Sequence, residues 1–277
     1  MVAAEPVRKT ERLAPAGAPG RSRSGEVDTL NMRVEDIRAL LAGFERPDIP
    51  LLCRLTRDPR VTVRNMAYRE LGERRSLAAN EALFRRGGTE LVAGADEAGR
   101  GALAGPLVAA AVLFEPGVEV DGVKDSKLLN PERREELYGS ILERAVSVSV
   151  VSVDSTSIDR HGLQVMNMKA LADALSGLRP ACDVAICDHY QPSGLRFATF
   201  GIPRADRIFH SVAAASIVAK VERDRVMRAM HCRFPRYNFI ENKGYGTREH
   251  ARALDEHGPC EVHRRSFGNV APGAGEV

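Results

Sequence analysis

The sequence predicts a mixed α/β domain that follows a smaller helical segment. Apolar runs of strand length occur at residues 90–96, 106–115 and 146–153 before the first long helical pattern, which favours an antiparallel meander. Two further strand-like runs, at 184–187 and 195–202, alternate with helical patterns at about 156–178 and 207–230. Helical spacing of apolar residues from Val34 to Phe44, and again over about 62–86, indicates the preceding helical segment.

Composition divides the 277 residues into four parts. Residues 1–31 are rich in Ala, Pro, Gly, Ser and Arg without periodicity, which predicts a disordered tail. Met32 opens the periodic part and is an alternative start of the chain. Residues 32–88 form the predicted helical appendage, residues 89–270 the main domain, and residues 271–277 a flexible C-terminal tail.

Charge is distributed unevenly along the chain. Residues 1–89 contain 17 Lys/Arg and 12 Asp/Glu, whereas the remaining residues contain 23 and 25. A basic front part beside a slightly acidic body is typical of contact with a polyanion. A helical brace packed on the main domain, with a solvated basic face, explains the same pattern equally well, so both interpretations stay open.

The cysteines and the apolar runs predict a cytoplasmic protein. The five cysteines are odd in number and include no Cys-x-x-Cys pair, so we expect reduced thiols in place of disulfides or a zinc site. No apolar run reaches the ~18 residues of a membrane helix. The N-terminus also lacks the apolar core of a secretory signal.

Acidic residues follow three of the predicted strands. Asp96 ends one apolar run, Asp188 ends another, and Asp206 follows the strand that reaches Ile202. Acids at the ends of neighbouring strands can converge on one cleft, where hard oxygen ligands suit Mg²⁺ or Mn²⁺. A single acid of this kind more simply caps a turn, but three in one domain favour a metal site.

The pair Asp96-Glu97 sets a geometric condition. Adjacent residues of a strand face opposite sides of a sheet. The two carboxylates therefore share a site only if the strand ends between them, and Ala98-Gly99 offers such an ending.

Glycines flank Arg100 directly after this pair. The segment does not match a dinucleotide-binding loop, because Gly94, Gly99 and Gly101 have the wrong spacing and a strand follows where a helix should. Glycines at 99 and 101 would let backbone amides approach a polyanion closely, and Arg100 could add a bidentate phosphate contact.

Several segments resemble the ribonuclease HII family of bacteria. In chain order they are VAGADEAGRGALAGP, KDSKLLNPERR, CDHY, PRAD, HSVAAASIVAKVERD, NKGYGTREH and HRRSFGNV, and they span about residues 90–270. The Asp-Glu pair followed by Gly-Arg-Gly separates the chain from the sister ribonuclease HIII. Two positions depart from the common family pattern: Arg204-Ala205 replaces Lys-Gly, and His189-Tyr190 replaces Gly-Asn.

The resemblance implies an RNase H-like fold, in which helices flank a mixed five-stranded sheet. It implies an endonuclease that cleaves the RNA strand of RNA–DNA hybrids and nicks duplex DNA 5′ of an embedded ribonucleotide. The expected products carry a 5′-phosphate and a 3′-hydroxyl. Two divalent ions, Mn²⁺ or Mg²⁺, would activate the water and stabilise the leaving oxyanion. A monomer is the family-like state.

The resemblance also assigns roles to residues. The expected catalytic and metal-binding carboxylates are Asp96, Glu97, Asp188 and Asp206. The backbone of Gly99, Arg100 and Gly101 is expected to read the ribose 2′-hydroxyl. Tyr245 is expected to stack under the sugar of the next nucleotide, although without the resemblance a half-buried loop aromatic is the plainer explanation. The expected phosphate contacts are Lys127, Lys243, Arg264 and Arg265.

Two other functions are compatible with the same fold. The first is a nucleic-acid binder without catalysis, which the presence of all four acids argues against. The second is a DNA-cleaving nuclease, which equal cleavage of all-DNA duplex and hybrid would support.

Overall fold

The computed structural model describes residues 32–42, 91–123 and 129–270, together with the single positions 51, 55, 63 and 81. The chain divides into two compact units, Met1–Glu45 and Arg46–Val277. In the first unit, helix α1 (Val34–Ala42) confirms the helix expected from the apolar spacing. The predicted tails at 1–31 and 271–277 lie outside the described residues, as does most of the helical stretch 62–86, of which Val63 and Glu81 are helical.

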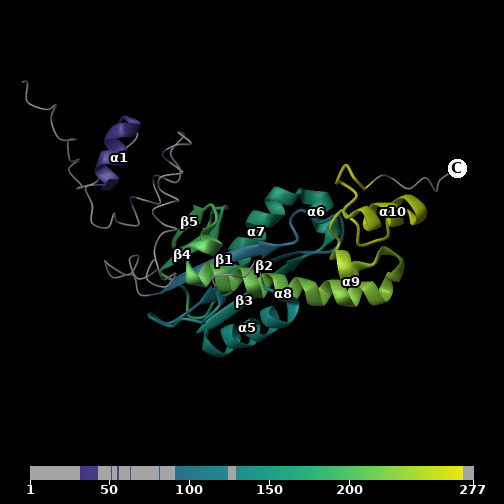
Figure 1. Ribbon diagram of the computed structural model, residues 1–277, viewed down its shortest axis with the longest axis horizontal. Helices are drawn as coiled ribbons and strands as arrows, with labels where there is room; N and C mark the ends of the chain where they lie inside the picture. Colours follow the sequence, from purple (N-terminus) through teal and green to yellow (C-terminus); the bar gives the residue numbers. More distant parts are fainter. Residues whose placement is uncertain are drawn as a thin grey trace, which may run out of the picture. The chain divides into compact units, whose positions relative to one another are not determined.

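A five-stranded mixed sheet forms the centre of the second unit (Figure 1). Its strands are β1 (Val92–Ala98), β2 (Leu107–Leu113), β3 (Ser147–Val153), β4 (Val184–Asp188) and β5 (Ala198–Ile202). Their order in the sheet is β3-β2-β1-β4-β5. Strand β2 is antiparallel to both of its neighbours, β1 and β3, whereas β4 is parallel to β1 and β5 is parallel to β4. The predicted mixed five-stranded sheet is therefore confirmed.

Helices cover both faces of this sheet (Figure 1). One face packs against α6 (Ser155–His161) and α7 (Leu163–Ser176), and the other against α5 (Pro131–Arg144) and α8 (His210–Arg233). The short helix η2 (Ala205–Arg207) connects β5 to α8. After α8 come η3 (Pro235–Tyr237), α9 (Phe239–Asn242) and α10 (Arg248–His257).

Two helical features differ from the sequence prediction. The expectation of three strands before the first long helix is wrong, because helix α5 lies between β2 and β3. Its start has a sequence signal: Asn130 accepts a 2.8 Å hydrogen bond from the backbone N–H of Arg133, and Pro131 fills the first helical position. The single helix expected at 156–178 is two helices, because Gly162, with φ of 85°, ends α6 and precedes α7.

Small residues bring α8 directly onto the sheet. A side-chain carbon at Gly94 of β1 would lie 2.2 Å from the backbone of Ser211, so only glycine permits this contact. Ala213, Ala214 and Ala215 are fully buried against the same face. The small-residue run at 213–216 thus allows close helix–sheet packing.

Four of the five cysteines lie in the described part of the chain. Cys182, Cys187, Cys232 and Cys260 are free thiols, and Cys53 lies outside the described residues. None of the helices that the structure describes is long and apolar enough to cross a bilayer.

The first turn of α8 is capped by a residue distant in sequence. Phe209, which precedes the helix, offers no side-chain acceptor. The buried carboxylate of Glu81 instead accepts hydrogen bonds from the backbone N–H of Ser211 at 2.6 Å and from its hydroxyl at 2.7 Å. An anion at a helix N-terminus satisfies free N–H groups and interacts favourably with the helix dipole. At Glu81 itself, this contact supports the brace interpretation.

Replacing Glu81 with Ala should therefore destabilise the domain. Loss of the carboxylate leaves a buried N–H and a hydroxyl of α8 without their acceptor, which costs about 1–3 kcal/mol in the free energy of unfolding. Urea denaturation measures the change. Glu143→Ala, which removes an exposed carboxylate of α5, is the control. Equal stability of the two variants would contradict a capping role for Glu81.

Candidate active site

The acidic residues gather where β1 and β4 separate. These parallel strands pair only as far as Ala95 and Cys187, while β1 continues beside β2. Asp96, Glu97 and Asp188 come directly after the last pair. The sequence led us to expect that the strand ends between Asp96 and Glu97. Instead β1 continues through both residues to Ala98. The two carboxylates share a pocket because the neighbouring strand has diverged and opened a gap that both can reach.

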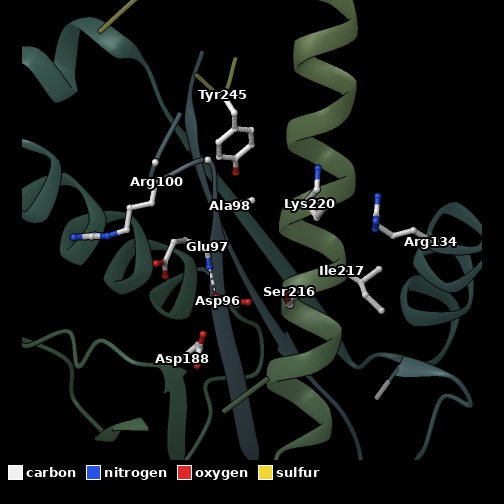
Figure 2. Close-up of a pocket in the computed structure, with 12 residues that line it drawn as sticks. Asp96, Glu97, Ala98, Arg100, Arg134, Asp188, Ser216, Ile217, Lys220 and Tyr245 are labelled. Atoms are coloured by element: carbon white, nitrogen blue, oxygen red, sulfur yellow. Dashed lines mark hydrogen bonds between the residues drawn. The ribbon is translucent and has the colours of Figure 1, made fainter. Parts of the chain in front are cut away.

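The pocket at this gap has a volume of about 400 Å³. Figure 2 shows Asp96 and Glu97 in its middle, with Tyr245 at one end and Asp188 at the other. Asp96 is paired with Ala110 and so lies on the α8 side of the sheet, whereas Glu97 lies on the α7 side. The other residues that line the pocket are Ala98, Gly99, Arg100, Gly101, Arg134, Ser216, Ile217 and Lys220.

Asp96 is a buried carboxyl group with a raised pKa. Only 6% of its surface is exposed. Burial is the largest cause of the increase in pKa, and repulsion from Asp188 and Glu97 adds to it. The hydroxyl of Ser216 and the backbone N–H of Glu97, at 2.8 Å from Oδ1, act in the opposite direction. The group therefore favours a proton or a cation beside it.

Glu97 also has a raised pKa. Burial, followed by repulsion from Asp188, raises its pKa to about 7. Arg100 and the amide of Asn167, fully buried on α7, lower it. The Oε2 atom of Glu97 is buried and receives no hydrogen bond from the described residues. This oxygen is available to a ligand.

Asp188 and Asp206 are connected through the start of η2. Asp188 Oδ1 accepts a 2.8 Å hydrogen bond from the backbone N–H of Ala205, which fixes this carboxylate at the mouth of the gap. Asp206 is the next residue and is only 1% exposed. Its side chain is not among those that line the pocket. The structure thus brings three of the four expected acids into the pocket and places the fourth beside it in the fold.

A divalent cation fits the chemistry of this pocket. Two buried carboxyl groups have raised pKa values, and one carries an oxygen without a hydrogen bond, so a cation would offset the repulsion between them. Asp96, Glu97 and Asp188 are the residues that would hold it. Within the described part of the chain, no three His, Cys, Asp or Glu side chains form a preformed metal cluster.

Two buried arginines hold the Gly-Arg-Gly loop (residues 99–101) and the segment after it. Arg223 donates to the carbonyl oxygens of Pro106 at 3.0 Å and Lys243 at 2.8 Å. Arg264 donates to the carbonyls of Arg100 at 2.9 Å and Gly105 at 3.0 and 3.2 Å. Both guanidinium groups are fully buried, and backbone carbonyls take the place of carboxylate partners. Burial, and then repulsion from Arg223, lowers the pKa of Arg264 to about 10, so Arg264 stays charged at neutral pH.

Gly99 is required by this arrangement. Its φ is 88°, in the left-handed region that favours glycine. A side-chain carbon at this position would lie 1.9 Å from Nε of Arg223. At exposed Gly101 the same carbon would meet no atom within 4 Å, which leaves open space on the outer side of the loop.

The four residues predicted to contact phosphate differ in how exposed their side chains are. The expectation for Arg264 is wrong, because this side chain is fully buried and donates to backbone carbonyls of the loop segment. The side chain of Lys243 donates to the carbonyl of Ile240. Arg265 is exposed, while its backbone N–H donates to Asp159. Lys127 lies outside the described residues.

The side chain of Arg100 is also engaged. It donates to the hydroxyl of Tyr190 at 3.1 Å and to Gln164 at 2.8 Å, and its guanidinium lies over the ring of Tyr190. Figure 2 shows it directed away from Tyr245. This geometry opposes the bidentate phosphate contact expected for the side chain.

Tyr245 projects over the pocket from a rigid support. Its ring is 38% exposed and lies 5.2 Å from the guanidinium of Arg223. Its carbonyl accepts a 2.9 Å hydrogen bond from Nδ1 of His250, which fixes the tautomer of that ring. His250 Nε2 then accepts from His263 Nε2 at 3.0 Å, and His263 Nδ1 accepts from the backbone N–H of Cys260 at 3.0 Å. Burial lowers the pKa of both histidines, so they are neutral.

Sequence reasoning missed two cations that line the pocket. Arg134 on α5 and Lys220 on α8 both contact Asp224, at 3.7 and 2.5 Å. Burial lowers the pKa of Lys220. In the sequence these residues belong to polar helical patterns that a solvated helix face explains equally well, so only the packing of α5 beside α8 identifies them.

Known proteins resemble this chain in sequence and in fold. The ribonuclease HII family model matches residues 93–270. The chain belongs to the ribonuclease HII family. A ribonuclease HII from Salinispora tropica is 46% identical over 201 residues, covering 72% of this chain and 74% of that protein. One from Xanthomonas campestris is 46% identical over 184 residues, covering 66% and 77%.

Solved structures show the same fold. The ribonuclease H2 from Pyrococcus horikoshii OT3 is 26% identical with a TM-score of 0.57, covering 65% of this chain and 95% of that one. Bst-RNase HIII in complex with Mn²⁺ is 23% identical with a TM-score of 0.54, covering 70% of each, and shows the fold alone. Membership of the ribonuclease HII family makes this chain an endonuclease of the ribonuclease H type, which acts on RNA–DNA hybrids and depends on divalent metal.

The raised pKa of Glu97 predicts a pH-dependent stability of the metal-free ribonuclease. The pKa of Glu97 is 4.5 in the unfolded chain and about 7 in the native state. Between these two pH values the native state holds a proton that the unfolded chain has released. The free energy of unfolding therefore falls as the pH rises through this range. Glu97→Gln should remove this contribution and raise stability at about pH 8 by roughly 2–3 kcal/mol. Urea denaturation with EDTA measures it, with Glu143→Gln as control. Parallel pH profiles of wild type and Glu97→Gln would contradict the prediction.

Because the guanidinium of Arg264 is buried, we expect its replacement to destabilise the protein far more than replacement of the neighbouring Arg265. Arg264→Met leaves the carbonyls of Arg100 and Gly105 buried without a donor, at a cost of about 2–4 kcal/mol in the free energy of unfolding. Arg265→Met, which changes only an exposed side chain, should cost less than about 0.5 kcal/mol. Thermal denaturation compares the two. Equal losses would contradict the proposed hold on the loop.

Proposed function

We propose that this ribonuclease HII hydrolyses the phosphodiester on the 5′ side of a ribonucleotide, both in RNA–DNA hybrids and in duplex DNA with a single embedded ribonucleotide. The products would carry a 5′-phosphate and a 3′-hydroxyl. The observation that carries the proposal is the single pocket that joins the three carboxylates to the Gly-Arg-Gly loop and Tyr245. A phosphodiester bound to the acids would have its ribose beside the loop.

The acids would act as ligands. Asp96, Glu97 and Asp188, together with Asp206 as the fourth carboxylate, would hold two divalent ions, Mn²⁺ or Mg²⁺. Such ions supply an activated water and neutralise the leaving 3′-oxyanion. The raised pKa values of Asp96 and Glu97 support this role, because each group gains more from a neighbouring cation than an exposed carboxylate would.

The loop would inspect the sugar. Arg223 and Arg264 bind the carbonyls of the loop segment, so its shape exists before the substrate arrives. The open side at Gly101 leaves room for a ribose to approach the backbone closely. A 2′-hydroxyl, which can both donate and accept, distinguishes RNA from DNA at such a site. Tyr245 would then contact the sugar of the following nucleotide.

Other basic groups would contact the phosphates. Arg265 is exposed, and Lys220 and Arg134 line the pocket, so each offers positive charge to a nucleic-acid backbone. Lys127 and Lys243 are further candidates from the sequence. We propose that the enzyme acts as a monomer.

The decisive experiment incubates the protein with Mn²⁺ or Mg²⁺ and a duplex DNA that contains one ribonucleotide. We expect a nick 5′ of that ribonucleotide and no cleavage of all-DNA duplex. Asp96→Asn should lower the rate by at least about 100-fold while duplex binding in EDTA is retained. Asp121→Asn, an exposed change after β2, is the control. Binding without any nick by the wild type would favour the non-catalytic binder, and equal cleavage of all-DNA duplex would favour the DNA nuclease.

A further inference from the structure

Asn167 is a fully buried amide on the face of α7 that packs against the sheet. The other buried residues of this helix are all apolar: Met166, Ala170, Leu171, Ala174 and Leu175. They belong to the apolar core on this side of the sheet, and their spacing places Asn167 on the same helical face. A single amide therefore occupies a position where the pattern of the helix predicts a hydrophobic side chain.

This amide contributes no hydrogen bond to the fold around it. Both Nδ2 and Oδ1 of Asn167 are buried, and neither is hydrogen-bonded to any residue that the structure describes. A buried amide without partners destabilises a protein relative to an apolar side chain of the same shape. Packing therefore gives no reason for an asparagine at this position, which points to a role in the adjacent site.

Glu97 is the neighbour of this amide on the α7 side of the sheet. Burial raises the pKa of its carboxyl group, whereas Arg100 and then the amide of Asn167 lower it, so the amide lies close to the carboxylate. The Oε2 atom of Glu97 is buried and likewise lacks a hydrogen bond from the described residues. An amide N–H donates and a carboxylate oxygen accepts. The two neighbouring side chains therefore carry a donor and an acceptor suited to each other.

The same part of α7 also holds Arg100. Gln164 lies three residues before Asn167, and its side-chain oxygen accepts a 2.8 Å hydrogen bond from Nη2 of Arg100. The Nη1 atom of Arg100 is buried and has no hydrogen-bond partner among the described side chains and backbone groups. Residues three apart on a helix lie on one face. The start of α7 thus directs two polar side chains toward this acid, Gln164 through Arg100 and Asn167 directly.

We propose that Asn167 is a positioning residue of the metal site: its amide N–H donates to the Glu97 carboxylate and holds that group in the orientation that binds a divalent ion. This inference rests on the proposed function, because it takes the ligand role of Glu97 from it. Carboxylates that bind metals are commonly oriented by hydrogen bonds from residues that do not touch the metal. An amide suits this task, because it orients the carboxylate without neutralising the negative charge that attracts the cation.

The test measures Mn²⁺ affinity and stability in the same variants. Asn167→Leu replaces the amide with an apolar side chain of nearly the same shape. The dissociation constant of Mn²⁺, measured by titration calorimetry without nucleic acid, should rise by about 10- to 100-fold. The urea midpoint in EDTA should stay the same or rise, because an unpaired buried amide is removed. Asn167→Ala should weaken Mn²⁺ binding equally and provides the measurement if the Leu variant does not fold. Met166→Leu, at the neighbouring buried position, is the control and should leave Mn²⁺ affinity unchanged.

A double-mutant cycle with Glu97→Gln distinguishes positioning from a general effect on the fold. If Asn167 acts through Glu97, Asn167→Leu should change the Mn²⁺ dissociation constant less than about twofold once Glu97→Gln is present. Unchanged affinity of the Asn167→Leu single variant, or an equal loss in both backgrounds, would overturn the inference. Wild-type affinity of Glu97→Gln would overturn the ligand role of Glu97 and the inference with it. Absence of any nick by the wild type would overturn the proposed cleavage alone, since this cycle uses no nucleic acid.

Discussion

The divergence of β1 and β4 beyond Ala95 and Cys187 is the constraint on which the site depends. While two parallel strands remain paired, adjacent residues of one strand are separated by the sheet itself. Where the pairing stops, both faces open into a single gap. Asp96 and Glu97 then reach one volume from opposite sides, and Asp188 closes it from the neighbouring strand. The buried carboxyl groups with raised pKa values follow directly from this geometry, since the gap is too enclosed to hydrate them fully.

Two buried, positively charged arginines hold the loop that forms the other side of the site. Arg223 and Arg264 lie beneath the loop segment without carboxylate partners, and the dipoles of backbone carbonyls compensate them. Moving the loop would break several charge-assisted hydrogen bonds together. The carboxylate side of the pocket is therefore strongly acidic, and the loop side is held in shape by cations. A phosphodiester is itself an anion and would be repelled by the carboxylates alone, so the proposed function requires divalent ions between them.

The sequence predicted the sheet and the acids well because both leave local signals. Apolar runs mark β1 and β4, and an acid at the end of such a run is conspicuous, as at Asp96 and Asp188. Residues that act through packing leave no such signal. Arg223 resembles any arginine of an amphipathic helix, yet it is fully buried. Arg264 was misjudged for the same reason, since the doublet Arg264-Arg265 does not reveal which member faces solvent. Helix α5 was not predicted although Asn130-Pro131 is a helix start, because only Leu137 and Ile141 of this helix are buried and its apolar pattern is therefore weak.

The neutral histidine pair under Tyr245 has one further consequence. Each hydrogen bond from the amide of Cys260 through His263 and His250 to the carbonyl of Tyr245 has a fixed direction, because a carbonyl accepts only and an amide donates only. No member can reverse alone, so the four groups form a cooperative unit with one proton order. The exchange rate of a single amide proton, that of Cys260, therefore reports the opening of the platform that carries the tyrosine ring. Motion of the support under the Tyr245 ring can thus be followed from an amide at the other end of the hydrogen-bonded chain.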